Sequence, residues 1–181
     1  MPERAERQGL IIVYTGDGKG KTTAALGTVL RALGYKWKVL IIQFVKGSWT
    51  YGEMKGLKRL EPDVELKILG KGFVGIVDDT KPIEEHEEAA QEALKAAIAD
   101  ILENIHDLVI LDEINVALDL GLIPLEEVKE LLRKKPKGMH LILTGRNAHS
   151  DIIEMADLVT EMKEIKHPFQ KGILAQRGVD F

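Results

Sequence analysis

The feature that most constrains this chain is a glycine-rich segment between an apolar run and a helix-forming run. The apolar residues 10–14 precede it, residues 24–26 follow it, and the segment consists of Gly16, Asp17, Gly18, Lys19, Gly20, Lys21, Thr22 and Thr23. Glycines let successive backbone N–H groups turn toward an anion, and the N-terminus of the following helix adds partial positive charge. Lys21 is placed to reach phosphate oxygens and the Thr22 hydroxyl to hold Mg²⁺. The segment therefore predicts a nucleoside phosphate site.

The spacing of this segment departs by one residue from the usual phosphate loop. The usual pattern would put its first glycine at Thr15, whereas the first glycine here is Gly16. A glycine turn without a ligand is the alternative interpretation. The position between a strand-forming run and a helix-forming run favours phosphate binding, because that arrangement brings the helix N-terminus to the anion.

Composition limits the classes of protein that need to be considered. The chain has 181 residues, 45% of them hydrophobic, and its 25 Lys and Arg against 29 Asp and Glu give a net charge of −4. This charge predicts no general attraction to nucleic acid or to acidic membranes. The chain contains no cysteine, which excludes disulfides and cysteine nucleophiles. We expect a cytoplasmic protein with a short N-terminal arm (residues 1–9) and one phosphate-loop domain (residues 10–181).

Strand-forming and helix-forming patterns alternate along the chain. Such alternation predicts an α/β fold with a mostly parallel sheet and helices on both faces, and with ligands at the carboxyl ends of the strands. The predicted strands are residues 39–44, 64–69, 108–111, 140–143 and 158–162, in addition to the run before the glycine segment. The predicted helices are residues 21–33, 53–60, a long helix after Pro82, one from about residue 124, and 151–155.

Polar residues follow several of these strands directly. Gly16, Gln43, Asp112 and Thr144 each come at such a position, so we expect them to converge on one crevice. An apolar strand ending in Asp112-Glu113 is typical of the second half of an ATP site, in which a carboxylate faces the hydrated Mg²⁺. A buried strand can also end in an acid that caps the next helix, but the glycine segment favours the metal interpretation.

Taken together, these motifs resemble the bacterial corrinoid adenosyltransferases, which transfer the adenosyl group of ATP to cob(I)alamin or to a related corrinoid such as cob(I)yrinic acid a,c-diamide. The resemblance spans residues 10–181. It implies a phosphate-loop, RecA-like fold, a homodimer, a requirement for Mg²⁺ or Mn²⁺, release of triphosphate, and an electron donor such as a flavoprotein. The runs that carry it are GDGKGKTTAA at 16–25, QFVKG at 43–47, LDE at 111–113, TGR at 144–146, KHPF at 166–169 and AQRGVD at 175–180.

The resemblance also assigns roles to individual residues. Lys21 and Arg146 would stabilise charge on the departing triphosphate, and Thr22, Asp112 and Glu113 would hold the metal. Phe73 would help to displace the lower ligand of the cobalt. Members of the family use an aromatic pair for this purpose, and this chain has Gly75 where the second aromatic falls.

Two other classes of protein remain as alternatives. A phosphotransferase or motor ATPase would need a residue that activates the group attacking the γ-phosphate, and Glu113 is the candidate for this role. A nucleotide-dependent switch is less favoured, because the chain lacks an Asn-Lys-x-Asp guanine signature. The reaction products separate these classes, since adenosyl transfer releases triphosphate whereas an ATPase releases ADP and phosphate.

Overall fold

A parallel β-sheet forms the centre of the molecule. The computed structural model describes residues 7–45, 51–70 and 82–180, and within them six strands pair in the order β3-β2-β4-β5-β1-β6. Every neighbouring pair is parallel. The strands are β1 (Ile11–Thr15), β2 (Val39–Gln43), β3 (Val64–Ile68), β4 (Leu108–Asp112), β5 (His140–Thr144) and β6 (Leu158–Glu161).

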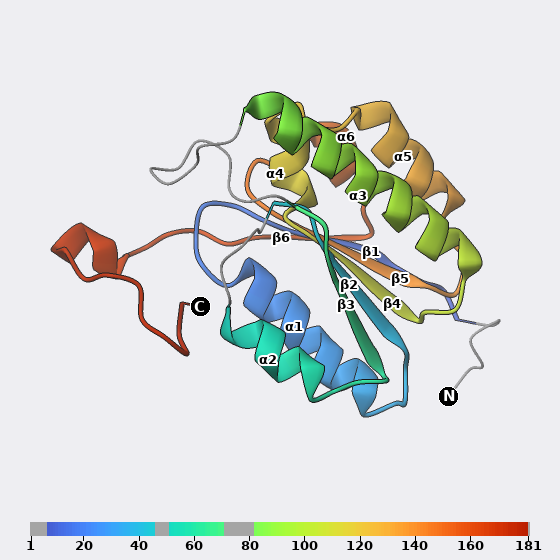
Figure 1. Cartoon of the computed structure of the whole chain (residues 1–181), viewed down its shortest axis with the longest axis horizontal. Coiled ribbons are helices and arrows are strands. Elements are labelled where there is room, and N and C mark those ends of the chain that lie inside the picture. Colours follow the sequence, from blue (N-terminus) through green and yellow to red (C-terminus); the bar gives the residue numbers. More distant parts are fainter. Residues whose placement is uncertain (1–6, 46–50, 71–81, 181) are drawn as a thin grey trace.

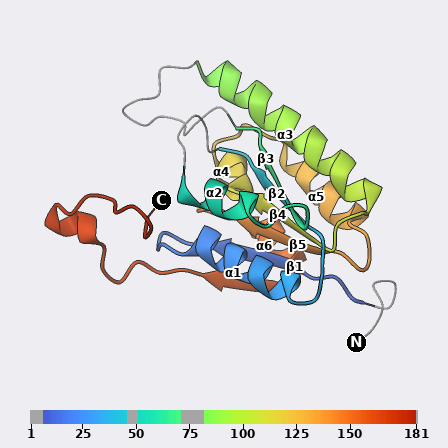
Figure 2. The ribbon, with the colours of Figure 1, turned by 60° about the horizontal axis from the view of Figure 1, so that its bottom comes forward.

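Helices cover both faces of the sheet, as the sequence predicts (Figure 1). One face carries α1 (Lys21–Leu33) and α2 (Gly52–Lys58). The other face carries α3 (Ile83–Glu103), α4 (Ile114–Asp119), α5 (Leu125–Lys134) and α6 (Ser150–Met155). Figure 2 shows the same two layers from another side. Within the described ranges, none of these helices combines the length and apolar character that crossing a lipid bilayer requires.

The central strands are apolar on both sides because helices pack on both sides of the sheet. Every residue of β2 and of β4 is buried. Alternate residues point to opposite faces, so Leu40 and Ile42 pack with α3 whereas Val39 and Ile41 pack with α1. The sheet thereby holds the carboxyl ends of its strands in fixed positions at one edge.

The predicted elements are present, with differences at their surfaces. Leu30, Ile83 and Ile105 lie at helical spacing with other apolar residues, which predicts that they are buried. In the structure they are exposed by 66%, 49% and 58%. Leu30 lies off the stripe of α1 that faces the sheet, which is formed by Ala25, Val29 and Ala32. Ile83 is the first residue of α3, and Ile105 lies beyond its end. The sequence patterns indicate neither α4 nor the short 3₁₀ turn η2 (Pro168–Lys171).

The described part of the N-terminal arm packs at the end of the sheet opposite the glycine segment (Figure 2). The Arg7 guanidinium lies 4.1 Å from the ring centre of Trp37 and pairs with Asp107 over 2.8 Å. The Trp37 ring stacks on His140 with 5.2 Å between centres, and His140 Nδ1 accepts a hydrogen bond from the backbone N–H of Leu10. Trp37 thus covers one end of the sheet.

Candidate active site

The glycine segment forms a tight loop between β1 and α1, and two of its glycines are sterically required. Gly16 has a φ of +92°, and a Cβ there would lie 2.5 Å from the Met162 carbonyl oxygen. A Cβ on Gly18 would lie 2.8 Å from the backbone of Lys163. The Gly18 N–H donates to the Met162 carbonyl over 2.7 Å. The loop therefore adopts its shape against the chain that follows β6, and larger residues would not fit.

Lys21 lies inside this loop, where the sequence predicts the phosphate-binding lysine. Its side chain is buried, and Nζ donates to the carbonyl oxygens of Gly16 at 2.6 Å and Gly18 at 2.9 Å. Burial lowers the pKa of Lys21, and the nearby Glu113 carboxylate partly opposes this shift. In the protein without a ligand, these two carbonyl oxygens accept hydrogen bonds from the Lys21 ammonium. Phosphate oxygens carry formal charge and are stronger acceptors, so they can replace these carbonyls when a ligand binds.

Asp112 is the centre of a buried hydrogen-bond cluster at the carboxyl ends of three strands. Its Oδ1 accepts from the Thr22 hydroxyl at 2.9 Å and from the Thr144 hydroxyl at 2.7 Å. Its Oδ2 accepts from Gln43 Nε2 at 3.2 Å. Asp112 is completely buried, and Gln43 is its register partner on β2. The predicted convergence of Gln43, Asp112 and Thr144 beside the loop is confirmed.

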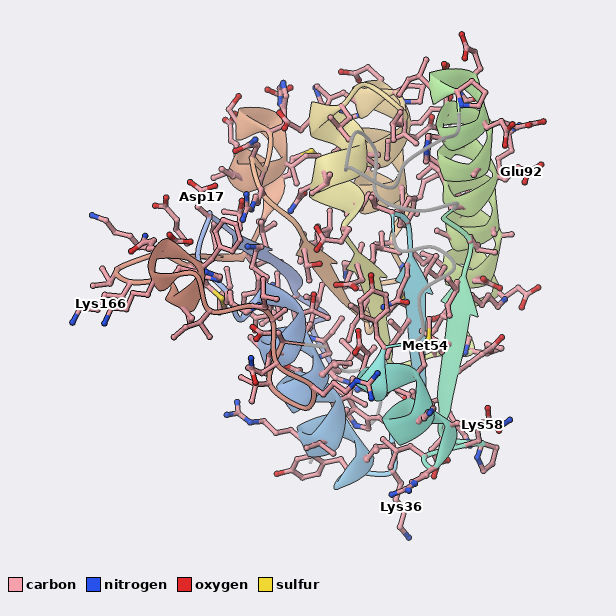
Figure 3. The ribbon with its side chains drawn as sticks, turned by 60° about the vertical axis from the view of Figure 1, so that its left-hand side comes forward. Asp17, Lys36, Met54, Lys58, Glu92 and Lys166 are labelled. Atoms are coloured by element: carbon pink, nitrogen blue, oxygen red, sulfur yellow. The ribbon has the colours of Figure 1, made fainter. Side chains whose placement is uncertain are left out.

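Glu113 and Arg146 lie around this cluster. Glu113 has a φ of +63° where the chain turns from β4 into α4, and its N–H donates to the Thr144 hydroxyl over 3.0 Å. A non-glycine residue in this backbone region is uncommon and is often found at functional sites. Arg146 is exposed and donates to the Asp17 carbonyl over 3.4 Å. Asp17 itself projects from the tip of the loop (Figure 3).

The other residues of the predicted site lie in different surroundings, and one of them falls outside the described residues. Thr23 is exposed in the first turn of α1, and Gly20 precedes that helix with a φ of +112°. Lys19 pairs with Asp180 near the C-terminus, a contact that sequence patterns did not indicate. Phe73 and Gly75 lie outside the described residues. Gln43 and Thr144 were predicted to reach the crevice, but their hydrogen bonds to Asp112 became apparent only from the fold.

The oxygen atoms of this cluster suit a magnesium ion. In the described part of the chain no group of three or more His, Cys, Asp or Glu side chains could hold a metal by itself. Mg²⁺ usually takes only one or two protein oxygens and completes its shell with water and phosphate oxygens. The Thr22 hydroxyl and the Asp112 carboxylate, 2.9 Å apart beside the loop, provide such a pair. The donor set therefore fits a metal that binds together with a nucleotide.

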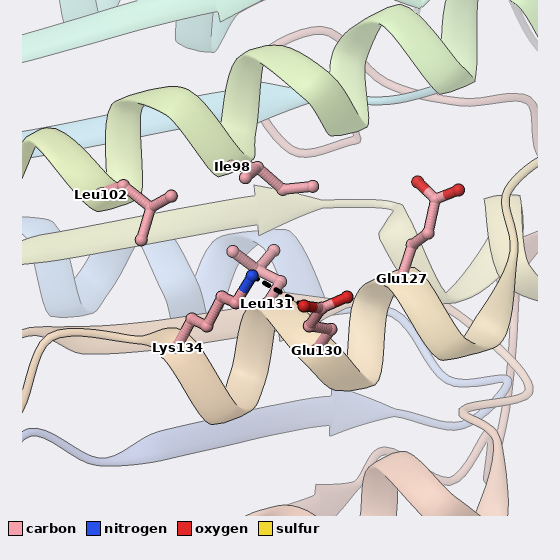
Figure 4. Close-up of a pocket in the computed structure, with 6 residues that line it drawn as sticks. All are labelled: Ile98, Leu102, Glu127, Glu130, Leu131 and Lys134. Atoms are coloured by element: carbon pink, nitrogen blue, oxygen red, sulfur yellow. Dashed lines mark ion pairs between the residues drawn. The ribbon is translucent and has the colours of Figure 1, made fainter.

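A separate depression of about 210 Å³ lies between α3 and α5 (Figure 4). Its floor is apolar, and its rim includes the ion pair between Lys134 and Glu130, whose atoms are 2.6 Å apart. None of the predicted site residues that the structure describes lines it; the lining residues are Ile98, Leu102, Glu127, Glu130, Leu131 and Lys134. The depression is therefore distinct from the phosphate loop.

The site combines the glycine-rich loop after β1 with the buried Asp112 at the end of β4, and β5 lies between these two strands. This arrangement defines a phosphate-loop nucleotide-binding protein with a RecA-like fold. The fold is similar to that of the flagellar accessory protein FlaH from Methanocaldococcus jannaschii, with a TM-score of 0.50. That similarity covers 87% of this chain and 74% of FlaH. At 13% sequence identity, it concerns the fold alone.

Sequence similarity identifies the family. Residues 7–181 match the family described as ATP:corrinoid adenosyltransferase BtuR/CobO/CobP. The chain is 41% identical to a corrinoid adenosyltransferase from Escherichia coli K12 over 182 residues, which cover 100% of this chain and 90% of that protein. It is 43% identical over 183 residues to one from a Sinorhizobium species, covering 100% of this chain and 84% of the relative. The chain belongs to the ATP:corrinoid adenosyltransferase family.

Proposed function

We propose that the glycine loop and the Asp112 cluster form the ATP site of an ATP:corrinoid adenosyltransferase. The 5′-deoxyadenosyl group is transferred to the cobalt of a reduced corrinoid, and triphosphate is released. The observation that carries this assignment is the hydrogen bond between Thr22 on α1 and Asp112 on β4, which joins the loop to the buried carboxylate. Membership of the family supplies the reaction type.

The chemistry requires the protein to stabilise a leaving group and not to supply a nucleophile. Cobalt in the Co(I) state donates an electron pair to the 5′ carbon of ATP, so the cobalt–carbon bond forms as the bond to the α-phosphate oxygen breaks. The electron pair of the broken bond leaves with the triphosphate, and the cobalt becomes Co(III). Negative charge therefore develops on the phosphate chain, where fixed positive groups are most effective.

Several residues of the site can supply this positive charge. Lys21 and the backbone N–H groups of the loop would bind phosphate oxygens, and Arg146 at the mouth of the loop would add a second cation. Thr22 and Asp112, with Glu113 beside them, would hold Mg²⁺ or Mn²⁺, and the metal would neutralise further phosphate charge. A charge-assisted hydrogen bond contributes about 1.5–3 kcal/mol, and more where it meets developing charge.

The partners of the reaction are proposed from the resemblance to the family. We expect a cytoplasmic homodimer, an electron donor such as a flavoprotein, and a role for Phe73 in displacing the lower ligand of the cobalt. An exposed edge strand supports contact between subunits, because Leu158 and Val159 on β6 are 42% and 39% exposed. Sedimentation velocity of the purified protein tests the dimer.

The decisive experiment is anaerobic mixing of the protein with ATP, Mg²⁺ and chemically reduced cobalamin. We expect the absorbance spectrum to change to that of adenosylcobalamin, with inorganic triphosphate as the second product. Lys21→Ala should lower kcat/KM by about 10²-fold or more with the fold intact. Lys58→Ala is the matched control, because Lys58 is exposed on α2 away from the loop (Figure 3). Formation of ADP and phosphate instead would contradict the proposal.

A further inference from the structure

The C-terminal segment, residues 162–180, contacts the phosphate loop at both of its ends. At its start, the Met162 N–H donates to the Thr15 carbonyl over 2.8 Å, and the Met162 carbonyl accepts from Gly18. The segment then runs away from the sheet, forms η2, and turns back toward the beginning of α1 (Figure 1). At its end, the Asp180 carboxylate lies 2.5 Å from Lys19 Nζ. The AQRGVD motif at 175–180 thus reaches the loop.

Asp180 is held in place before any ligand binds. Its Oδ2 accepts from the Gln176 N–H at 2.7 Å, and its own N–H donates to the Gln176 carbonyl at 2.8 Å. Gly178, with a φ of +79°, allows the chain to turn between them. Only 14% of the Asp180 side chain is exposed, against 50% for Lys19. The hydrogen bond from Lys19 lowers the pKa of Asp180, so the group is a carboxylate at neutral pH.

We propose that Asp180 is a positioning residue for ATP: it holds the Lys19 ammonium at the mouth of the phosphate loop, so that the C-terminal segment completes the triphosphate site. This inference rests on the proposed function of the loop. A lysine side chain has many rotamers, and ordering it when a ligand binds opposes binding. The ammonium has three N–H donors, so one can remain on Asp180 while the others bind phosphate oxygens.

A purely structural role for this ion pair fits the segment less well. Much of its apolar surface is uncovered, since Ile165, Phe169, Leu174 and Val179 are 77%, 69%, 72% and 79% exposed. The segment therefore adds little buried apolar area to the domain, and an ion pair with a half-exposed lysine adds little to the stability of the fold. Loss of the pair should change ligand affinity and leave the melting temperature unchanged.

The test is calorimetric titration of inorganic triphosphate, with Mg²⁺ present and no corrinoid, into the full chain. We expect Asp180→Asn and Lys19→Met each to weaken binding about fivefold, the upper end of what a partly exposed ion pair contributes. The double variant should bind no more weakly than Lys19→Met, and Asp180→Glu should recover most of the affinity. Glu164→Gln is the matched control, because Glu164 lies in the same segment and accepts a hydrogen bond from Gln170 and not from the loop.

Steady-state kinetics provide a second readout. Asp180→Asn should raise KM for ATP and leave kcat and KM for the corrinoid unchanged. Wild-type affinity or tighter binding in Asp180→Asn would overturn the inference, as would additive losses in the double variant. These outcomes differ from failure of the proposed function, in which the wild-type protein would bind no triphosphate and Lys21→Ala would change nothing.

Discussion

The Thr144 hydroxyl lies between the Asp112 carboxylate and the backbone of Glu113. It donates to Asp112 Oδ1 over 2.7 Å and accepts from the Glu113 N–H over 3.0 Å. One side chain on β5 therefore holds the Asp112 carboxylate and the backbone of Glu113. Because β5 separates β4 from β1 in the sheet, Thr144 also links the Asp112 carboxylate to the side of the site that carries the phosphate loop.

We expect Thr144→Val to damage both stability and activity. The substitution keeps the shape of the side chain but removes a donor to a buried carboxylate and an acceptor for Glu113 N–H. Losing hydrogen bonds at buried polar groups of this kind costs about 1–3 kcal/mol. Urea denaturation and kcat/KM measure the two effects. Thr144→Ser keeps the hydroxyl and should behave nearly as wild type; equal behaviour of the two variants would show that the hydroxyl is not used.

Asp112→Asn should weaken the dependence of the rate on Mg²⁺ or Mn²⁺, because the amide lacks the negative charge that attracts a divalent cation. Binding of the corrinoid should change little. Titration of Mn²⁺ followed by electron paramagnetic resonance measures the affinity directly. Asp119→Asn is the control, since Asp119 pairs with Asn147 at the surface. An unchanged metal titration would assign Asp112 a structural role.

Two glycine-to-alanine substitutions should affect different properties: one should lower ATP affinity, and the other should raise stability. Gly18→Ala places a methyl group 2.8 Å from the backbone of Lys163, so the loop must shift and ATP affinity should fall. Gly27→Ala lies on the exposed side of α1, where an added Cβ meets no atom within 4 Å. It should raise the free energy of unfolding by about 0.5–1 kcal/mol through helix propensity. Nucleotide titration and thermal unfolding separate the two; normal ATP affinity in Gly18→Ala would contradict the tight packing.

Stability should decrease as the pH falls below about 6.5, the ordinary histidine value. Burial lowers the pKa of both His106 and His140, with Arg7 adding to the shift at His140. The unfolded chain therefore takes up protons at a higher pH than the native protein, so stability is full above the unfolded pKa and is lost as pH falls toward the folded pKa.

Thermal unfolding between pH 8 and pH 5.5 measures this effect. His140→Gln should make the melting temperature less dependent on pH, because it removes one of the two groups. The same substitution at His149, which is exposed at the start of α6, is the control. An undiminished pH dependence in His140→Gln would exclude a contribution from His140.

Phe73→Ala should impair the reaction when it starts from cob(II)alamin and a mild reductant. If the ring displaces the lower ligand of the cobalt, its loss makes reduction to cob(I) harder. The effect should be much smaller with pre-reduced cob(I)alamin, because the reduction is then bypassed. Gly75→Trp should raise the population of four-coordinate cob(II)alamin, which electron paramagnetic resonance detects. Equal losses from both starting states would mean that Phe73 only supports the pocket.

The sequence predicted the sheet and the phosphate loop well because both depend on local patterns. Continuous apolar runs identify strands that are buried on both faces. The glycine-lysine-threonine pattern predicts the loop because each of these residue types contacts the phosphates or the metal in a defined way. The sequence does not indicate α4, because this helix is short and begins one residue after β4, without a separate helix signal. Leu30 was misplaced because apolar character alone does not show which stripe of a helix faces the sheet.

The parts of the site that the sequence did not reveal depend on contacts distant along the chain. Lys19 and Asp180 are separated by nearly the whole sequence, and no local pattern pairs them. The hydrogen bonds of Gln43 and Thr144 to Asp112 follow from strand order and register, which periodicity does not determine. The steric need for glycine at Gly16 and Gly18 likewise comes from the chain after β6.

The strand order has a consequence for how the chain is made. β2 pairs with both β3 and β4, so these three strands can associate as they leave the ribosome, but β1 pairs with β5 and β6. The first strand synthesised must therefore wait for residues 140–144 before it gains a neighbour. A nascent chain released before that point would carry Lys21 and Asp112 but would lack β5, the strand that lies between β1 and β4 and fixes the phosphate loop beside Asp112. Nucleotide binding by arrested chains of increasing length would thus begin only after β5 has emerged.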